Sequence, residues 1–262
     1  MSLRNRVAIV TGAGGGIGEA VAMRLAQAGA KVVIAEVNST GGRRVEKAML
    51  DCGTDGLFIE TDVSVLGDVE RLMETTFSRF GRLDILVNNA GVNFVKPTLE
   101  VSEAEWDHVL GVDLRGTFFC AQQALRLMLK ARQGAIINIA SVHATATIPG
   151  AAPYAAAKAG VVGLSRALAA EFGPFGIRIN CVSPGATATQ IWEDAQACAE
   201  DPEVFRSYWT RHTALEKIAT PMEIAGVVVF LASEEAAYVS GANIVVDAGM
   251  TAMLTCRQEK PL

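Results

Sequence analysis

The sequence has no apolar run long enough to span a bilayer as a helix. Its longest wholly apolar stretches, such as VVVFLA at 227–232, are far shorter than the roughly 20 residues that a spanning helix needs. The opening MSLRNRVAIV also leaves no room for the long apolar segment of a signal peptide. We therefore expect a cytoplasmic protein with no membrane partner.

An excess of positive charge is also missing. The chain has 23 Lys and Arg against 28 Asp and Glu, which gives a formal net charge of -5, and the basic residues are scattered. A nucleic-acid partner requires a basic stripe or patch that faces the phosphate backbone. We therefore expect no nucleic-acid partner.

Cysteine and histidine are few and show no ligand spacing. An odd number of cysteines without any CxxC pair argues against both a disulfide framework and a zinc site. The three histidines are far apart in the sequence, so we expect no bound metal. We expect reduced, mostly buried thiols at Cys52, Cys120, Cys181, Cys198 and Cys256.

What the sequence does contain is a repeated alternation of short apolar runs and longer segments of helical period. The predicted helices cover 17–28, 40–51, 65–80, 102–130 and 154–172. The predicted strands are almost wholly apolar rather than alternating, which is typical of a parallel sheet covered on both faces; they lie at 6–12, 31–36, 56–62, 83–91, 134–141, 176–185 and 243–249.

This order of elements predicts a Rossmann-type α/β fold. The doubly wound parallel sheet would be the middle layer of a three-layer α/β/α sandwich. Half of the 262 residues are apolar and no Pro- or Ser-rich linker interrupts them, so we expect a single domain over 1–262.

The glycine-rich segment TGAGGGIG, residues 11–18, follows the first predicted strand and opens the first helix. Glycines at this point let a backbone approach a pyrophosphate, and the helix N-terminus offers free N–H groups. The segment lacks the GK[ST] of a nucleoside triphosphate loop. It predicts a dinucleotide site that includes Gly12, Gly14, Gly16, Ile17 and Gly18.

A carboxylate at the end of the second predicted strand indicates which dinucleotide is bound. Glu36 can accept hydrogen bonds from ribose hydroxyls, and its charge would repel a 2'-phosphate. Val37 rather than a basic residue follows it, and Arg43 and Arg44 are expected to be solvated charges. We therefore expect NAD rather than NADP.

Five motifs in order resemble those of the short-chain dehydrogenase/reductase family, and the resemblance covers nearly the whole chain. TGAGGGIG resembles the family's TGxxxGIG, NNAG at 88–91 its NNAG, YAAAK at 154–158 its YxxxK, and PGATAT at 184–189 its PGxxxT. Ser141 stands thirteen residues before Tyr154, as the family's catalytic serine does. Within the family, the chain resembles sugar dehydrogenases and 3-oxoacyl reductases.

The resemblance implies further contacts to the cofactor. Asp62 and Val63 would flank the adenine, and the segment after the fourth predicted strand would lie beside the ribose. The nicotinamide end would be held by the turn at Pro184 and by the residues just after that turn. The residues implied are Asp62, Val63, Asn89, Ala90, Gly91, Pro184, Gly185, Thr187 and Thr189.

Tyr154 and Lys158 stand four positions apart, on one face of a predicted helix otherwise made of alanines. A free tyrosine is almost wholly neutral at pH 7. A nearby ammonium favours the phenolate by charge attraction. We therefore expect Tyr154 to remove the proton of a secondary alcohol, Ser141 to hydrogen-bond the developing carbonyl oxygen, and Lys158 to support Tyr154 and anchor the cofactor ribose.

One position departs from the family pattern. In GVDLRG, Asp113 stands where the family usually has an asparagine that steadies a kink in a long helix. Its main-chain carbonyl could still serve the family's proton relay, whereas its side chain offers a carboxylate near Lys158 in place of an amide. We include Asp113 among the catalytic residues.

The segment 186–220 is predicted to be a helical flap over the cleft, although a surface excursion without ligand contact is the alternative. The flap and His143 suggest a sugar or polyol substrate, and a 3-oxoacyl or hydroxysteroid substrate remains open. The candidate substrate contacts are His143, Trp192, Glu193, Tyr208, Trp209 and His212.

The resemblance also implies a homotetramer, in which the small residues Ala155, Ala159 and Gly163 would permit two long helices to pack closely. Two other functions stay open. A catalytically idle NAD-binding scaffold could dispense with Tyr154 or Lys158, and an epimerase that retains its NAD would release no NADH.

Overall fold

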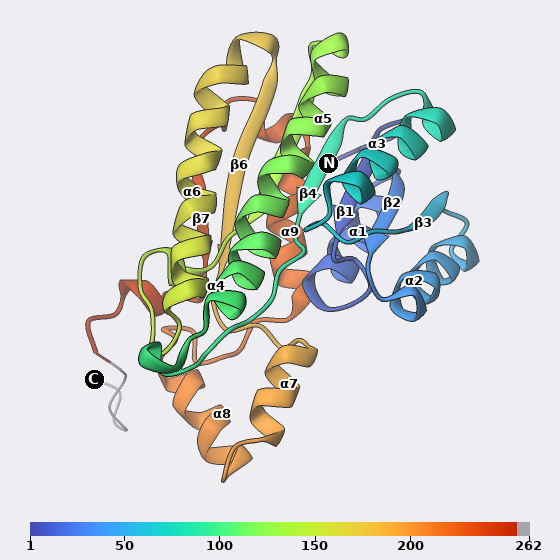
Figure 1. Cartoon of the computed structure of the whole chain (residues 1–262). Coiled ribbons are helices and arrows are strands. Elements are labelled where there is room, and N and C mark those ends of the chain that lie inside the picture. The colour runs from blue at the N-terminus through green and yellow to red at the C-terminus, as the bar shows by residue number, and fades with distance from the viewer. Residues whose placement is uncertain (256–262) are drawn as a thin grey trace.

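A computed structural model describes residues 1–255 (Figure 1). Its centre is a seven-stranded sheet in the order β3-β2-β1-β4-β5-β6-β7, in which every neighbouring pair is parallel. The strands are β1 (Val7–Thr11), β2 (Lys31–Glu36), β3 (Gly56–Glu60), β4 (Ile85–Asn88), β5 (Gly134–Ile139), β6 (Ile177–Pro184) and β7 (Asn243–Val246).

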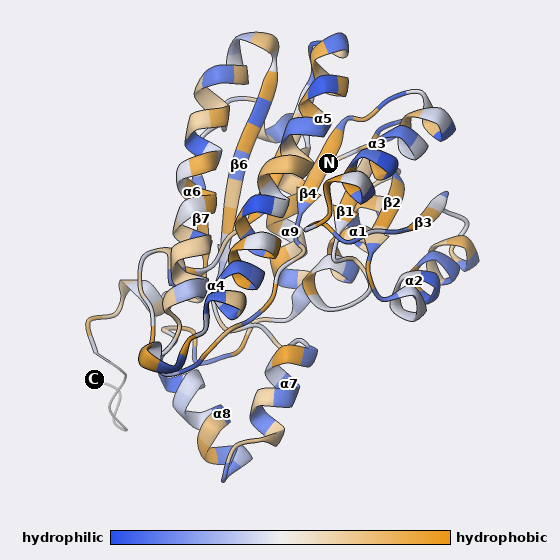
Figure 2. Cartoon of the chain, in the orientation of Figure 1, coloured by the Kyte–Doolittle hydropathy of each residue, from blue (hydrophilic) through white to orange (hydrophobic). Residues whose placement is uncertain are grey.

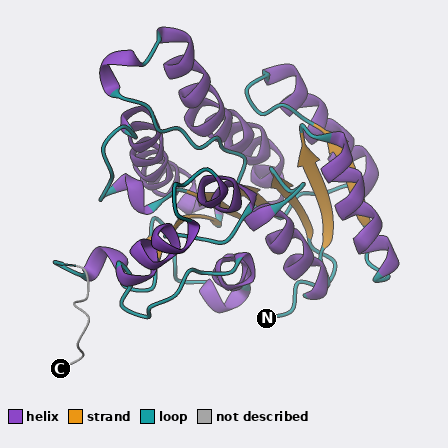
Figure 3. Ribbon diagram, turned by 90° about the horizontal axis from the view of Figure 1, so that it is seen from below, coloured by secondary structure: helices purple, strands orange, loops and turns teal. Residues whose placement is uncertain are grey.

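Helices cover both faces of this sheet, as Figure 3 shows from below. On one face lie α3 (Leu66–Phe80), α4 (Glu103–Leu110), α5 (Thr117–Ala131) and α6 (Ala152–Phe172). On the other lie α1 (Gly16–Gln27), α2 (Ser39–Asp51) and α9 (Pro221–Ala232). The predicted doubly wound, three-layer fold is confirmed.

The core has two halves because successive strand residues point to opposite faces. Ile9 packs with α3 and α5 on one side of the sheet, whereas its neighbours Ala8 and Val10 pack with α1 and α9 on the other. Most strands are accordingly apolar along most of their length, although β6 carries the polar residues Arg178 and Asn180 (Figure 2). Helices such as α3 have an apolar face toward the core and a polar face toward solvent, whereas α9 is apolar nearly all round.

The helix expected over 102–130 is interrupted by a π-helical segment, Gly111–Gly116, between α4 and α5. The Thr117 hydroxyl donates to the main-chain carbonyl of Asp113 at 2.8 Å, one of the bonds inside this wider turn. A Cβ on Gly116 would lie 3.0 Å from Val63, so the segment approaches the strand end closely. This is the kink that the family resemblance implies, and it places the Asp113 side chain in the interior.

The prediction that the cysteines are mostly buried is wrong for half of those described. Cys120 and Cys181 are buried, whereas Cys52 and Cys198 are exposed because they end α2 and α7 (Gln190–Ala197) at the surface. All four are free thiols, and Cys256 lies outside the described residues. Over residues 1–255, no helix is long and apolar enough to cross a membrane.

Two helices, α7 and α8 (Pro202–Arg211), lie beyond the carboxyl ends of the strands, at the bottom of Figure 1. Asp201 caps α8 because its side chain accepts hydrogen bonds from the N–H groups of Glu203 and Val204. Trp192 of α7 packs on Phe205 and Trp209 of α8, with ring centroids 5.0 and 6.1 Å apart. These helices form the helical part of the flap.

Candidate active site

A cleft of about 680 Å³ opens along the carboxyl edge of the sheet. Parallel doubly wound sheets bind ligands at this edge. Most of the predicted site residues line the cleft together: Gly12, Gly16, Ile17, Glu36, Asp62, Val63, Asn89, Ala90, Gly91, Ser141, His143, Tyr154, Lys158, Pro184, Gly185, Thr187, Thr189, Trp192 and Trp209.

The glycine loop adopts a conformation that side chains would oppose. Gly12 and Gly16 have φ values of 63° and 55°, in the left-handed region that favours glycine. A Cβ on Gly18 would lie 2.1 Å from the carbonyl oxygen of Gly12. Asn89 donates to the carbonyls of Thr11 and Gly12 at 3.0 Å each, which holds the loop against the end of β4.

The N-terminus of α1 opens into the same part of the cleft. Its N-cap is Gly15, and no side chain makes a capping hydrogen bond there. Free N–H groups and the positive end of the helix dipole suit a pyrophosphate. The tight glycine turn, the uncapped helix end and the cleft together fit a dinucleotide.

Glu36 is fixed at the end of β2 by two main-chain donors. Its Oε2 accepts from the N–H of Gly14 and its Oε1 from the N–H of Asn38, both at 2.9 Å. A Cβ on Gly14 would lie 2.7 Å from Glu36, which explains glycine at that position. Each carboxylate oxygen keeps a lone pair that could accept from a ribose hydroxyl.

Arg44 is exposed, as the sequence suggests, but it is also ion-paired. It reaches from α2 to Glu19 of α1 with two bonds of 2.6 Å and donates to the Gly14 carbonyl at 3.1 Å. The pKa of Arg44 is raised because Glu19 accepts its hydrogen bonds. The guanidinium is thus held against the glycine loop, a contact between two helices that sequence spacing does not reveal.

The two ends of the cleft are shaped by short local hydrogen bonds. Asp62 accepts from the N–H and hydroxyl of Ser64 at 2.9 and 2.7 Å, which orders the turn beside Val63. At the other end Thr187 donates to the Gly185 carbonyl at 3.0 Å. The Thr189 side chain makes no capping bond at the start of α7, so its hydroxyl is available to a ligand.

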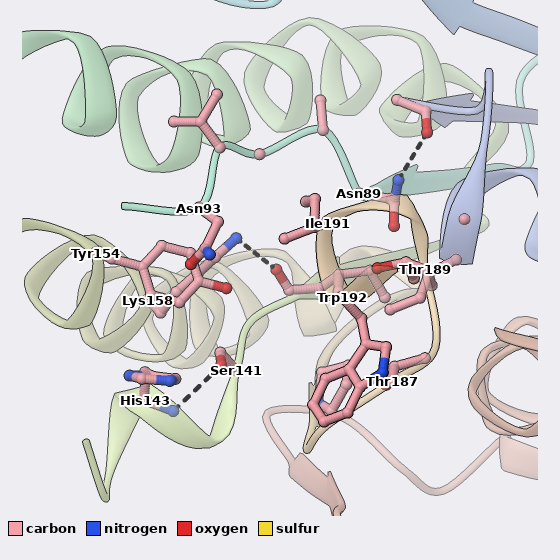
Figure 4. A pocket seen from close by; sticks show the side chains of 18 of the residues that line it. Asn89, Asn93, Ser141, His143, Tyr154, Lys158, Thr187, Thr189, Ile191 and Trp192 are labelled. Atoms are coloured by element: carbon pink, nitrogen blue, oxygen red, sulfur yellow. Dashed lines mark hydrogen bonds between the residues drawn. The ribbon is translucent and has the colours of Figure 1, made fainter. Parts of the chain in front are cut away.

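Ser141, Tyr154 and Lys158 meet at the centre of the cleft (Figure 4). Ser141 follows β5, and its Oγ accepts from the N–H of His143 at 3.2 Å. Tyr154 and Lys158 share one face of α6, with Lys158 Nζ 5.4 Å from the centroid of the tyrosine ring. The serine and tyrosine hydroxyls thus border one space, next to a buried ammonium.

Lys158 is held by one hydrogen bond and one ion pair. Its Nζ donates to the carbonyl of Ile139 at 3.2 Å and lies 3.0 Å from Oδ2 of Asp113. Burial lowers the pKa of Lys158, whereas the negative charges of an ionised Tyr154 and of Asp113 raise it. The net effect is a raised pKa, so Lys158 stays protonated at neutral pH.

Only some of the predicted substrate contacts line the substrate end of the cleft. His143, Trp192 and Trp209 line it, whereas Tyr208 is half exposed and stacks on His212 outside it, at 4.2 Å between centroids. Glu193 also lies outside it. His143 Nδ1 is engaged with the Thr147 hydroxyl at 2.8 Å, and burial lowers the pKa of His143.

Sequence reasoning missed most of the apolar lining. These residues are Val92, Val95, Ile148, Ile191, Phe205 and Met250. Val92 follows NNAG directly and Val95 stands three residues further on, and Met250 follows the last predicted strand, so proximity to a motif or a strand end was the available signal. Ile191 and Phe205 lie on the flap helices, where only the tertiary fold shows which face meets the cleft.

Comparisons with known proteins agree with this geometry. A family model described as enoyl-(acyl carrier protein) reductase matches residues 12–251. A short chain dehydrogenase/reductase of Aspergillus oryzae is 41% identical over 256 residues, which is 95% of this chain and 96% of that protein. The meso-2,3-butanediol dehydrogenase of Serratia marcescens is 40% identical over 252 residues, or 96% and 97%.

A solved structure, that of levodione reductase, superposes with a TM-score of 0.92 at 37% identity. The match covers 95% of this chain and 98% of that one.

Proposed function

The chain belongs to the short-chain dehydrogenase/reductase family, and on that premise we propose that it uses NAD(H) to interconvert a secondary alcohol and a ketone with a largely apolar skeleton. Family membership makes it an oxidoreductase that uses a nicotinamide cofactor. The observation that carries the proposal is the cluster of Ser141, Tyr154 and Lys158 inside the cleft.

In this proposal each residue of the cluster has one task. A bound nicotinamide dinucleotide would take up or give back a hydride at the reacting carbon. The Tyr154 oxygen removes the proton of the alcohol, or returns it to the ketone in the reverse direction. The Ser141 hydroxyl donates to the substrate oxygen as it becomes a carbonyl, and the Lys158 ammonium favours the tyrosine phenolate.

The dinucleotide would be held along the rest of the cleft. The N–H groups at the start of α1 would face the pyrophosphate, and Glu36 would accept from the ribose hydroxyls. The Glu36 carboxylate supports NAD over NADP because a 2'-phosphate would meet its negative charge. Arg44 does not offset this repulsion, because its guanidinium is already paired with the Glu19 carboxylate.

The lining of the substrate end supports an apolar substrate over the sugar or polyol that the sequence suggested. The walls are built mainly from Val95, Ile148, Ile191 and Trp192, with Asn93 and Gln190 as polar side chains, and the His143 ring nitrogen nearest to Thr147 is already engaged. A polyol would find few partners for its several hydroxyl groups against such walls. A small diol is the second candidate, because a relative is a meso-2,3-butanediol dehydrogenase.

The flap and the exposed face of α6 complete the proposal. Trp192 and Trp209 place the flap at the mouth of the cleft, which supports its role as a cover for the substrate. Ala159 and Gly163 are exposed on α6, and a Cβ on Gly163 would meet nothing within 4 Å. This small-residue face supports the expected homotetramer.

The proposal is tested by assaying cofactor reduction with NAD and NADP in parallel, over alicyclic alcohols, small diols, sugars, hydroxysteroids and 3-hydroxyacyl esters. We expect NAD to be preferred and alicyclic alcohols to have the highest kcat/KM. Trp192→Ala should lower that kcat/KM roughly tenfold, because an apolar contact to the substrate is lost.

Val204→Ala is the matched control for Trp192→Ala, because Val204 is an exposed residue of the same flap. It should leave kcat/KM unchanged. A preference for sugars, or equal losses in the two variants, would contradict the assignment of the substrate class. A preference for NADP would contradict the assigned role of Glu36.

A further inference from the structure

A buried ion pair lies directly behind the proposed catalytic tyrosine. Asp113 is 0% exposed and Lys158 is 4% exposed. The distance from Lys158 Nζ to Asp113 Oδ2 is 3.0 Å, although this oxygen receives no well-aligned hydrogen bond, so the contact is mainly electrostatic. A carboxylate and an ammonium this close form a nearly neutral unit in a region from which water is excluded.

The surrounding chain is arranged to hold the Asp113 carboxylate in this position. Its Oδ1 accepts from the N–H of Val92 at 2.8 Å, and its main-chain carbonyl accepts from the Thr117 hydroxyl. A Cβ on Gly91 would lie 3.1 Å from Lys158 Nζ and 3.2 Å from Asp113 Oδ2. The π-helical segment, Val92 and Gly91 together fix the pair.

We infer that Asp113 is a positioning residue that offsets part of the positive charge of Lys158, so that Tyr154 loses its proton at a higher pH than it would with an uncharged residue at position 113. This deepens the function proposed above and rests on it. The physical reason is that the ammonium stabilises the phenolate while the carboxylate behind it opposes the same ionisation. The alcohol-oxidising reaction therefore reaches its plateau at a more alkaline pH.

The other titratable groups around the pair do not account for this effect. Burial raises the pKa of Cys181 on β6 to about 11, so its thiol is neutral below that pH. Burial lowers the pKa of His143, whose ring lies 5.4 Å from that of Tyr154, so it is neutral in the alkaline range. His108 of α4 lines the same cleft. Among the described neighbours, Asp113 is the carboxylate paired with Lys158.

Asp113→Asn removes this charge with the least change of shape. The amide oxygen can still accept from Val92, the main-chain bond to Thr117 is unaffected, and Lys158 keeps the carbonyl of Ile139. The chain has three tyrosines, so the ultraviolet absorbance of tyrosinate can be followed against pH and the Tyr154 contribution obtained by subtracting Tyr154→Phe. This titration needs no substrate, so it can fail independently of the proposed function.

We expect Tyr154 in Asp113→Asn to titrate about one pH unit below the wild-type chain. The pH dependence of kcat/KM for alcohol oxidation should move by the same amount in the same direction. A loss of rate that is equal at all pH values would indicate a merely structural role and overturn the inference. An unchanged or higher titration midpoint would also overturn it.

Asp84→Asn is the matched control. Asp84 is also a buried, ion-paired carboxylate that accepts from a main-chain N–H, but it precedes β4 at the opposite edge of the sheet. It should leave the Tyr154 midpoint unchanged. If Asp113→Asn does not fold, Asp113→Ser, a smaller uncharged side chain, takes its place. Tyr154 should again titrate below the wild-type chain, and an equal or higher midpoint would overturn the inference.

Discussion

Tyr154→Phe is expected to lower kcat/KM by about a thousandfold or more, in both directions of the reaction. The loss arises because the phenol is the group proposed to carry the proton, and a positioned acid or base contributes on the order of 10² to 10⁴ in rate. Initial rates with the best alcohol and its ketone measure the effect. Dinucleotide affinity, measured by calorimetry, should change only a few-fold, because the glycine loop and Glu36 are untouched.

Tyr238→Phe is the matched control for this prediction. The Tyr238 side chain is fully exposed and remote from the cleft residues, so its variant should keep the wild-type rate. If Tyr154→Phe retained a tenth or more of the activity, the proton would have another carrier and the proposed role of Tyr154 would be wrong.

Gly18→Ala is expected to weaken dinucleotide binding tenfold or more. The added Cβ would lie 2.1 Å from the carbonyl oxygen of Gly12, so one turn of the glycine loop must move away from the start of α1. Overpacking of this kind costs about 1 to 3 kcal/mol, which the free loop relieves by moving. Binding must restore the loop, so that energy is lost from affinity, and each 1.4 kcal/mol is a tenfold change. Calorimetric titration with NAD measures the loss, and the thermal melting temperature reports any effect on the fold.

Gly226→Ala tests whether a glycine-to-alanine change in a helix is harmful in itself. Gly226 lies in α9, and a Cβ there would meet nothing within 4 Å. Alanine is the better helix former, so this variant should melt slightly higher and bind NAD as the wild-type chain does. Equal affinity of Gly18→Ala and wild type would contradict the assignment of this loop to the dinucleotide.

The fold was predictable because the strands are short, mostly apolar and regularly separated by helices of clear period. Each predicted strand appears, and each begins and ends within a few residues of the expected position. The spacing of Val65, Val69, Leu72, Met73, Phe77 and Phe80 predicts one buried stripe on α3. Val69, Leu72 and Met73 are buried as predicted and Phe80 partly so, whereas the prediction is wrong for Val65 and Phe77, which are 48% and 41% exposed. Local pattern was sufficient here because local and tertiary preferences agree.

The motifs also predicted which residues gather at the cleft, because the carboxyl ends of parallel strands meet at one edge of the sheet. The contacts that were missed depend on tertiary structure. The ion pair of Arg44 with Glu19 joins two helices, and the outward orientation of the Tyr208 side chain depends on how α7 and α8 pack. The exact approach of Asp113 to Lys158 depends on the π-helical segment, which no periodicity in the sequence specifies.

The most direct test of the proposed chemistry is to supply an alicyclic alcohol deuterated at its carbinol carbon, together with NAD, and to weigh the reduced dinucleotide by mass spectrometry. We predict one deuterium in each NADH molecule and one ketone formed for each NADH, with both lost in Tyr154→Phe. Ketone without labelled NADH, deuterium retained in the product, or NAD binding without any turnover of the alcohols tested would contradict a dehydrogenase in which Tyr154, Ser141 and Lys158 act together.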